Sequence, residues 1–377
     1  MNRKIARFLA DHAPETPCLV VDVDAIAESY DLLCRCLSSA SVYYAVKANP
    51  APEIVATLAA KGSNFDVASP AEISLCLGHG ATPERLSFGN TIKKERDIAF
   101  AYEAGVRLFA FDSAAELEKL ARGAPASRVF CRILVSCEGA DWPLSRKFGC
   151  APDMAVGLLQ QARELGLDPY GVSFHVGSQQ TDIGQWDKAV GAVARMFTLL
   201  AETDISLKMV NIGGGFPAQY RGRVASLADY AQAVTDALTR HFGNRLPEII
   251  VEPGRSLVGD AGIIHSEVVL IADKGDGGGK RWVYLDVGKF NGLAETMGES
   301  IKYRIEAPAE RRGSPQPVVI AGPTCDSADI LYEHTEYRLP EDLAVGDKVA
   351  ILSTGAYTAS YASVGFNGFP PLRTYCI

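Results

Sequence analysis

Two features of membrane and nucleic-acid-binding proteins are missing from this sequence. It has no stretch of about 18 or more consecutive apolar residues, which is the length that a membrane-spanning helix needs. Lys and Arg form no run interleaved with aromatic residues, and the formal net charge is -8 at pH 7. Nucleic acids and anionic lipids attract positively charged surfaces. We therefore expect no nucleic acid and no membrane as a partner, and we favour a small molecule.

The sequence also lacks a complete set of metal ligands and a recognisable export signal. Nine cysteines occur in 377 residues, but the pairs Cys34/Cys36 and Cys131/Cys137 have no second pair and no His-x-His group that would complete a zinc site. The short apolar stretch near the start is interrupted by Asp11, unlike a signal peptide. We expect reduced thiols, no metal site and a cytoplasmic location.

Short apolar runs alternate with segments of helical period from about residue 42 to residue 255. The intervening segments, such as PEIVATLAAKG and AAELEKLARG, repeat Leu, Ile and Ala every three or four residues and close on glycine. Strand followed by helix, eight times in succession, predicts an α/β fold with a closed (β/α)8 barrel of the TIM type, and a doubly wound open sheet is the alternative. The predicted strands are 42–46, 64–68, 85–88, 107–111, 128–135, 170–176, 207–212 and 248–252.

Strand-like runs without intervening helices follow the predicted barrel. Examples are KRWVYLDVG and DKVAILSTGAYT, which are bounded by Gly, Asp and Pro. A chain of this length usually divides into two cores. We predict a barrel domain over residues 15–255 and a β-rich C-terminal domain over residues 256–377. The N-terminal segment 1–24 contains a strand-like run, PCLVVDVD, and is a candidate to pack on the C-terminal domain.

Polar residues lie where the predicted barrel strands end, and in this fold the chemistry takes place at the carboxyl ends of the strands. Lys47 directly follows an apolar run, where burial would lower the pKa of its amine and free the lone pair for attack on an aldehyde. Taken alone, such a lysine is more often a solvated surface residue. The residues at these ends are Lys47, Asp66, Arg132, His175, Gly213, Gly214, Gly215 and Glu252.

Three glycines follow one strand directly in the run VNIGGGFP (210–217). Without Cβ atoms, the backbone can bring its N–H groups against a phosphate. Gly213, Gly215 and Ala218 also match the dinucleotide spacing GxGxxA. Pro217 and the YRGR run that follows would interrupt the helix that such a motif requires, so we do not interpret the glycines as a dinucleotide site.

Two further motifs carry groups suited to an aromatic, phosphorylated cofactor. VEPGRS (251–256) combines the Glu252 carboxylate, which could keep a pyridine nitrogen protonated, with Arg255, which suits bidentate phosphate contact. The alternative is an ordinary Glu/Arg ion pair at a domain junction. In FHVGS, His175 could stack on a cofactor ring while Ser178 donates to the phosphate, although a lone histidine at a strand end is more often a satisfied core residue.

Taken together, seven motifs resemble the ornithine/diaminopimelate/arginine decarboxylase family, the fold-type-III pyridoxal 5'-phosphate (PLP) enzymes. They occur in order, with family-like spacing, from about residue 15 to the C-terminus, and they are most similar to the bacterial ornithine and lysine/ornithine decarboxylating members. The motifs are YAVKAN (44–49), FDVASPAEI (65–73), SFHVGS (173–178), NIGGGFP (211–217), EPGR (252–255), GPTCDS (322–327) and GAYT (355–358).

The resemblance implies a role for each matching position. Lys47 would hold PLP as a Schiff base, Glu252 would contact the pyridine nitrogen, and His175 would stack on the ring. Cys325 would protonate the decarboxylated carbon and Asp326 would bind the distal amine of the substrate, both reaching in from the second subunit of a head-to-tail homodimer. The remaining positions that would bind the cofactor or shape its pocket are Asp66, Glu72, Arg132, Ser178, Gly213, Gly214, Gly215, Gly254, Arg255 and Tyr357.

The far end of the substrate discriminates between members of this family. A distal ammonium needs an acid, which Asp326 and nearby Asp329 supply, whereas the distal carboxylate of diaminopimelate needs a basic group. Eukaryotic ornithine decarboxylases place a second aspartate where this sequence has Thr296 by strict register, so Glu295 or Glu299 could substitute. Tyr357 is a further expected substrate contact.

We expect decarboxylation of L-ornithine to putrescine, a step of polyamine biosynthesis. Lysine, or both amino acids, is the alternative, because one methylene is worth only about 1–3 kcal/mol in a pocket. Diaminopimelate decarboxylase, an amino-acid racemase and a non-catalytic decoy homologue are further alternatives. A racemase would need a tyrosine base in place of Cys325, and a decoy should lose residues such as Lys47, Glu252 and Arg255, which this sequence retains.

Overall fold

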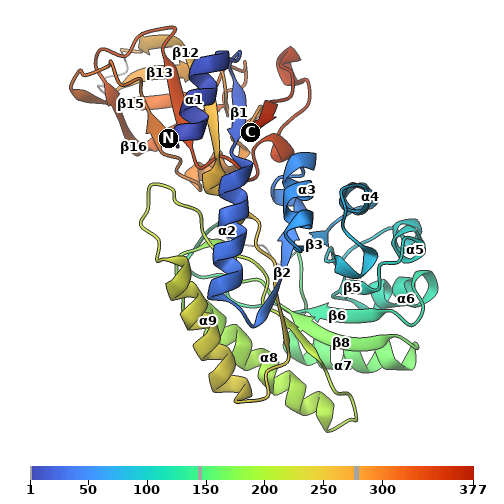
Figure 1. Ribbon diagram of the computed structural model, residues 1–377. Helices are drawn as coiled ribbons and strands as arrows, with labels where there is room; N and C mark the ends of the chain where they lie inside the picture. Colours follow the sequence, from blue (N-terminus) through green and yellow to red (C-terminus); the bar gives the residue numbers. More distant parts are fainter. Residues whose placement is uncertain (1, 143–146, 276–279) are drawn as a thin grey trace. The chain divides into compact units, whose positions relative to one another are not determined.

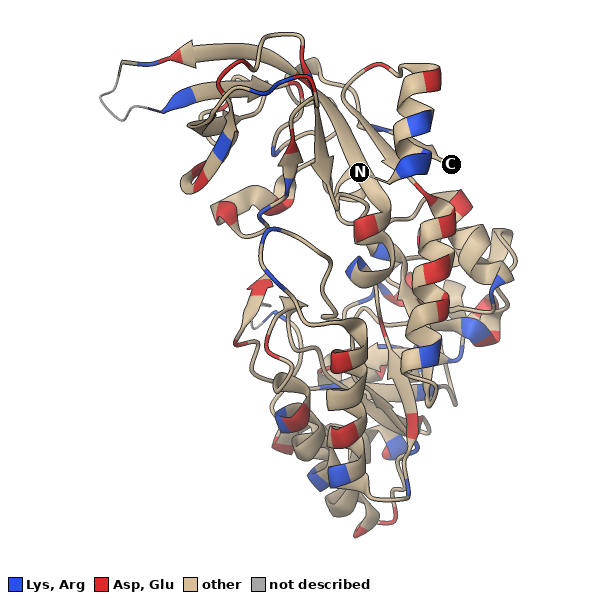
Figure 2. Ribbon diagram, turned by 60° about the vertical axis from the view of Figure 1, so that its left-hand side comes forward, with Lys and Arg blue, Asp and Glu red and all other residues tan. Residues whose placement is uncertain are grey.

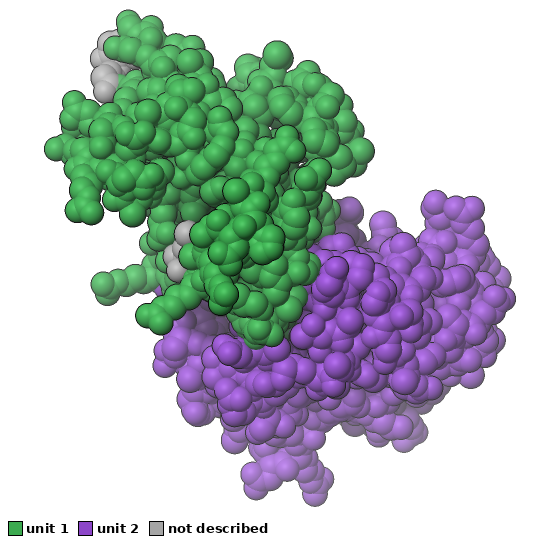
Figure 3. Space-filling view, turned by 45° about the horizontal axis from the view of Figure 1, so that its top comes forward, with its two compact units in different colours: residues 1–26, 218–223, 255–377 green, residues 27–217, 224–254 purple. Residues whose placement is uncertain are grey.

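The computed structural model describes residues 2–142, 147–275 and 280–377, which form two compact units (Figure 3). The barrel unit comprises Ala27–Pro217 and Val224–Gly254, and the sheet unit comprises Met1–Ile26, Ala218–Arg223 and Arg255–Ile377. Residues 15–26 and 218–223, which lie within the range expected for the barrel domain, therefore group with the sheet unit.

Eight parallel strands close into a barrel in the order β10-β11-β2-β3-β4-β5-β6-β8 (Figure 1). This confirms the predicted (β/α)8 barrel and rules out the open sheet. Every barrel strand lies within or overlaps a predicted strand. The strands are β2 (Ala40–Ala45), β3 (Asn64–Val67), β4 (Leu86–Phe88), β5 (Leu108–Phe111), β6 (Arg128–Arg132), β8 (Asp168–Ser173), β10 (Met209–Asn211) and β11 (Glu248–Val251).

Helices connect the barrel strands and surround them in Figure 1. Local sequence sets where they begin. Helix α4 starts after Ser69, whose hydroxyl accepts from the backbone N–H of Glu72 at 3.3 Å, and Pro70 fits the first turn. The helices are α2 (Val23–Cys36), α3 (Pro52–Ala60), α4 (Pro70–Gly78), α5 (Glu95–Glu103), α6 (Ala114–Gly123), α7 (Pro152–Glu164), α8 (Gln185–Ala201) and α9 (Leu227–Phe242).

Departures from a regular repeat of strand and helix occur at two places along the chain. Strand β11 is followed by the four-residue helix α10 (Arg255–Val258) rather than by a long helix. A small antiparallel pair, β7 (Ala140–Trp142) and β9 (Ser178–Gln180), lies in the loops that follow β6 and β8. Side chains from several barrel strands, among them Tyr43, Phe130 and Ile250, form a buried cluster.

The sheet unit is built on a β-sheet with the order β14-β17-β12-β13-β15-β16, to which β1 is added beside β12 and β18 beside β1. The N-terminal strand β1 pairs antiparallel with β12 and parallel with β18. Helix α1 (Arg3–His12) packs on this sheet through Ile5. The strands are β1 (Cys18–Val21), β12 (Gly262–Asp273), β13 (Arg281–Leu285), β14 (Ile305–Glu306), β15 (Pro315–Ala321), β16 (Ile330–Pro340), β17 (Lys348–Leu352) and β18 (Arg373–Cys376).

Among the described residues, none of the helices combines the length and apolar character that a membrane crossing demands. Acidic and basic positions are interspersed along the helices (Figure 2).

One ion pair is buried in the barrel unit. The Nζ atom of Lys93 lies 2.9 Å from Oε1 of Glu116, and neither side chain is more than 3% exposed. The same Nζ donates to the carbonyl oxygens of Asn90 at 2.8 Å and Ala110 at 2.6 Å. Burial lowers the pKa of Lys93 to about 8, and the Glu116 carboxylate opposes this shift. The pair thus joins β5, α6 and the loop after β4.

We expect Glu116→Ala to lower the free energy of unfolding by about 3–5 kcal/mol, because it leaves the Lys93 ammonium buried without its anion. Glu95→Ala is the matched control, since it removes an exposed pair with Arg122 at 2.9 Å, for which the expected loss is much smaller because solvent screens the charges. Urea unfolding of both variants measures the difference. Equal losses would contradict a structural role for the buried pair.

Candidate active site

The barrel brings the predicted site residues to the carboxyl ends of its strands. Lys47 lies in the short helix η1 (Val46–Ala48) directly after β2, and Asp66 is paired in register with Ala45 of β2. Ser173, at the end of β8, pairs with Arg132 on one side and with Asn211 on the other. Because the strands are parallel and the barrel is closed, these ends share one rim.

The first group at this rim joins Lys47 to Asp66. Their Nζ and Oδ2 atoms lie 3.7 Å apart, and the lysine side chain is 54% exposed whereas the aspartate is 6% exposed. Burial, followed by the like charge of Glu252, raises the pKa of Asp66 to about 8, while Lys47 acts in the opposite direction. The second oxygen of Asp66, Oδ1, is buried and has no hydrogen-bond partner among the described residues.

Gly89 makes room for this aspartate. A Cβ atom at position 89, just after β4, would clash with Oδ1 of Asp66. No local sequence pattern marks Gly89, because its neighbour Asp66 comes from a different strand.

The second group holds the Glu252 carboxylate. The side-chain amide of Asn211 donates to Oε1 of Glu252, and Oδ1 of Asn211 accepts from the backbone N–H of Gly213 at 2.9 Å. The backbone N–H of Glu252 donates to the carbonyl of Gly213 at 2.8 Å. Asn211 therefore links the predicted carboxylate to the glycine run. Sequence reasoning missed its role, although it stands two residues before the first glycine of that run.

The glycine run forms a backbone cradle that side chains would fill. Gly213 and Gly215 have φ values of 68° and 99°, in the left-handed region that favours glycine. A Cβ atom at Gly214 would meet the carbonyl oxygen of Glu252 at 2.5 Å, and one at Gly215 would meet that of Gly177 at 2.7 Å. The close approach of these backbones explains why glycine occupies the positions.

His175 follows β8 as a neutral ring. Its Nδ1 atom accepts a hydrogen bond from the backbone N–H of Gly177 at 3.0 Å, which places the ring proton on Nε2. Burial, and then the positive charges of Arg132 and Lys47, hold the pKa of His175 well below its usual range. Ser178 lies close by in the sequence, at the first position of β9.

Glu72 and Arg132, which were expected to shape the cofactor pocket, are each held by a local contact. Oε2 of Glu72 accepts from the backbone N–H of Ala68 at 2.7 Å, and burial raises the pKa of this carboxyl group. The Arg132 guanidinium lies 5.3 Å from the ring centroid of Phe148.

In the sheet unit, Arg255 opens α10 and is bonded to Glu295. Its Nη1 and Nη2 atoms donate to the two carboxylate oxygens at 2.7 and 2.6 Å, and both side chains are at most 4% exposed. Nη1 also donates to the hydroxyl of Tyr220 at 2.7 Å. The ring of Tyr357, whose φ is 55°, lies 4.8 Å from the guanidinium carbon. Glu295, expected as a substrate ligand, thus has both oxygens bonded to Arg255.

The loop after β15 exposes a thiol and a carboxylate. Cys325 is exposed, and its backbone N–H donates to the side chain of Asn367 at 2.9 Å. Asp326 is also exposed, and one of its oxygens accepts from the backbone N–H of Ala328 at 2.8 Å. Both side chains are accessible for contact with a ligand.

The other acids considered for the distal amine bind backbone groups instead. Asp329 is buried and accepts from the backbone N–H groups of Lys289 at 2.7 Å and Thr324 at 3.0 Å. Glu299 accepts from the backbone N–H groups of residues 333–335 at 2.6–2.8 Å. Partial burial raises the pKa of Glu299, but these bonds outweigh it and lower the pKa to about 2. Asp329 therefore organises the loop after β15, and Glu299 binds the backbone of β16.

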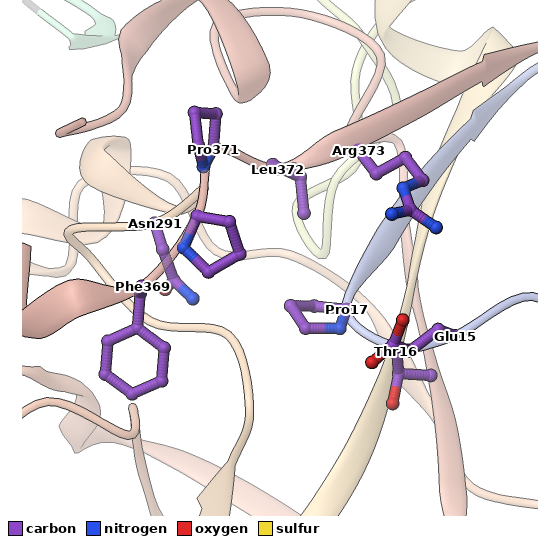
Figure 4. A pocket seen from close by; sticks show the side chains of 9 residues that line it. Glu15, Thr16, Pro17, Asn291, Phe369, Pro371, Leu372 and Arg373 are labelled. Atoms are coloured by element: carbon purple, nitrogen blue, oxygen red, sulfur yellow. The ribbon is translucent and has the colours of Figure 1, made fainter. Parts of the chain in front are cut away.

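The described residues contain no cluster suited to a metal ion, and one of the pockets of the sheet unit lies apart from the predicted site residues. Among the described residues, no group of three or more His, Cys, Asp and Glu side chains is placed to hold a metal ion. A pocket of about 130 Å³ in the sheet unit (Figure 4) contains none of the predicted site residues. It is lined by Glu15, Thr16, Pro17, Asn291, Phe369, Pro370, Pro371, Leu372 and Arg373.

The barrel rim therefore suits PLP on three independent grounds. The amine of Lys47 can bind an aldehyde. The buried Oδ1 of Asp66 has no hydrogen-bond partner among the described residues and can accept one from a ligand. The cradle of Gly213–Gly215 presents backbone against which a phosphate can lie.

We expect Asp66→Asn to flatten the pH dependence of stability. The folded-state pKa of about 8 exceeds the unfolded value of about 3.9, so between these values the folded chain holds a proton that the unfolded chain has released. The stability that Asp66 contributes is fully present below about pH 4 and is lost as the pH rises through about 8.

Unfolding free energies from pH 4 to pH 8, without added PLP, test this expectation. The variant should gain stability over the parent protein as the pH rises. Asp153→Asn, which changes an exposed aspartate in α7, is the control and should follow the parent protein. Parallel profiles for Asp66→Asn would rule out the raised pKa.

Comparisons with known proteins identify the family. Residues 23–259 match the family model of the pyridoxal-binding domain of pyridoxal-dependent decarboxylases. The lysine/ornithine decarboxylase of Selenomonas ruminantium is 34% identical over 370 residues, which cover 98% of this chain and 91% of that protein.

Solved structures extend the agreement to the whole fold. A crystal structure of SrLDC in complex with PLP and cadaverine has a TM-score of 0.89 and 32% identity, over 100% of this chain and 94% of that chain. The arginine decarboxylase of Paramecium bursaria Chlorella virus, bound to agmatine, has a TM-score of 0.90 and 27% identity over 100% of both chains. The chain therefore belongs to the fold-type-III pyridoxal-dependent decarboxylases, and it is a PLP-dependent amino-acid decarboxylase.

Proposed function

We propose that this decarboxylase converts L-ornithine to putrescine and carbon dioxide in polyamine biosynthesis. The observation that carries the proposal is the exposed carboxylate of Asp326, beside Cys325, in a loop where Asp329 is buried and bonded to backbone. An exposed carboxylate suits the distal ammonium of a diamino acid, with which it can form a charge-assisted hydrogen bond. The name of the Selenomonas ruminantium relative includes both lysine and ornithine, so lysine is the second candidate substrate.

PLP is held, in this proposal, by the residues that the resemblance indicated. Lys47 carries the cofactor, and Arg255 and Tyr357 join the glycine cradle as phosphate contacts. The full proposed set is Lys47, Asp66, Arg132, His175, Ser178, Gly213, Gly214, Gly215, Glu252, Gly254, Arg255 and Tyr357. We assign Glu295 to the orientation of Arg255, because both of its oxygens already bind that guanidinium.

When bound, PLP supplies an electron sink for the pair of electrons left at Cα as carbon dioxide departs. Glu252, oriented by Asn211, is placed to keep a proton on the pyridine nitrogen and so maintain that sink. His175, neutral and held by Gly177, packs a flat ring on the cofactor without adding a positive charge. Asp66, with a pKa of about 8, can exchange a proton with the amine of Lys47 near neutral pH.

The proton that completes the reaction comes, we propose, from Cys325, which returns it to Cα. Asp326 and Tyr357 bind the substrate. Cys325 and Asp326 act in the active site of the second subunit of a homodimer, so that the two active sites are shared. Both side chains are exposed in the single chain, as residues that serve a neighbouring subunit need to be. We place the enzyme in the cytoplasm.

Lys47→Ala should abolish the visible absorbance of enzyme-bound PLP, because the amine that holds the cofactor is gone. Absorbance spectra of the purified variant after PLP addition and desalting provide the measurement. Lys61→Ala is the control, because Lys61 lies directly after α3 and is paired with Asp31. This variant should keep the spectrum. A retained band in Lys47→Ala would refute the assignment.

The substrate is tested by competing ornithine and lysine, with arginine and diaminopimelate assayed in parallel. We expect ornithine to have the highest kcat/KM. Asp326→Asn should lower that kcat/KM by about 10- to 100-fold without changing the PLP absorbance, because a hydrogen bond to a charged group is worth about 1.5–3 kcal/mol.

Glu295→Gln, measured in the same assay, distinguishes a role of Glu295 in orienting Arg255 from a role in binding the substrate beside Asp326. If Glu295 orients Arg255, this variant should weaken PLP retention while the ratio of ornithine to lysine kcat/KM stays the same. A changed ratio with normal PLP retention would assign Glu295 to the substrate. Unaltered kinetics in Asp326→Asn would remove the basis for the diamino acid proposal.

A further inference from the structure

We propose that a cavity in the sheet unit, the arginine pocket, binds a small molecule that carries phosphate groups. The cavity has a volume of about 360 Å³ and is lined by Arg221, Arg304, Ile305, Glu336, Tyr337 and Arg338. None of these residues belongs to the proposed PLP or substrate sites. Small-molecule sites typically enclose about 300–1,000 Å³, so the space admits a ligand larger than a simple ion.

The lining carries a surplus of positive charge. Glu336 is the one carboxylate among the lining residues, and it is already paired with Arg338 at 2.6 Å. Within the described part of the chain, neither Arg221 nor Arg304 forms an ion pair with a carboxylate. Two guanidinium charges are therefore uncompensated around one cavity, which raises the local concentration of anions.

Neutral oxygen atoms orient these two guanidinium groups. Nη1 of Arg221 donates to the carbonyl oxygen of Glu336 at 2.8 Å, and the same guanidinium lies 4.2 Å from the ring centroid of Tyr337. Nη2 of Arg304 donates to the hydroxyl of Ser353 at 3.2 Å. A guanidinium has five N–H donors, so each group keeps donors for a ligand. A fixed fork of donors matches the oxygens of carboxylate and phosphate groups alike. Two guanidinium charges at one pocket favour the more highly charged phosphate.

The buried wall of the pocket is rigid. The hydroxyl of Tyr337 donates to the carbonyl of Tyr303 at 2.7 Å, and its ring stacks on that of Tyr332 with centroids 4.2 Å apart. Tyr332 in turn donates to the carbonyl of Ile301 at 2.8 Å. Because Tyr337 supports the exposed Arg221, a ligand has less motion of that side chain to freeze on binding.

Calorimetric titration of the PLP-loaded, full-length enzyme with inorganic pyrophosphate tests the proposal. PLP occupies its own phosphate site under these conditions, so the titration reports a second site. We expect saturable binding that weakens by at least about tenfold in the double variant Arg221→Gln/Arg304→Gln, because charge-assisted hydrogen bonds are lost. Arg304→Lys, which keeps the charge but not the fork, should weaken binding by a smaller factor.

Arg245→Gln is the matched control, since it removes an exposed arginine of the barrel unit. Its affinity for pyrophosphate should equal that of the parent protein. Absence of saturable binding in the parent protein would overturn the proposal, as would equal weakening in the control and the double variant. If the double variant fails to fold, judged by circular dichroism, Arg304→Lys alone decides the outcome, and unchanged affinity in that variant counts against the pocket.

Discussion

The barrel rim depends on the electrostatic constraint of placing two carboxylates and an amine together. Burial, and then the like charge of Glu252, raises the pKa of Asp66. Lys47 opposes this shift from 3.7 Å. The proposed cofactor chemistry would use the same arrangement, with Lys47 holding the cofactor and Glu252 facing its ring.

The acidic residues of the sheet unit serve a different purpose from those of the barrel rim. Glu299 and Asp329 accept backbone N–H groups, and Glu295 neutralises a buried arginine. Asp329 stabilises the loop that carries Cys325 and Asp326, whereas Glu299 binds the backbone of β16. Asp326 differs from these acids in being exposed, and the arginine pocket is a separate basic feature of the same unit.

Much of the fold and of the site could be predicted from residue order. The eight barrel strands were visible because short β-branched runs recur between helical segments, and a closed parallel sheet then requires their ends to meet. That rule indicated Lys47, Asp66, His175 and Glu252 as neighbours at one rim. The family motifs extended this to PLP, because they specify which group stands at each end.

The sequence by itself determined the barrel, the family and the cofactor, since each follows from local periodicity or from motifs that are contiguous in the chain. Only the tertiary structure decided which partners those groups have. Asn211 reaches Glu252, Gly89 accommodates Asp66, and Arg255 takes up Glu295. Each pair joins residues at least 23 positions apart, and hydrogen bonding and burial at that separation depend on how the chain packs rather than on any local pattern.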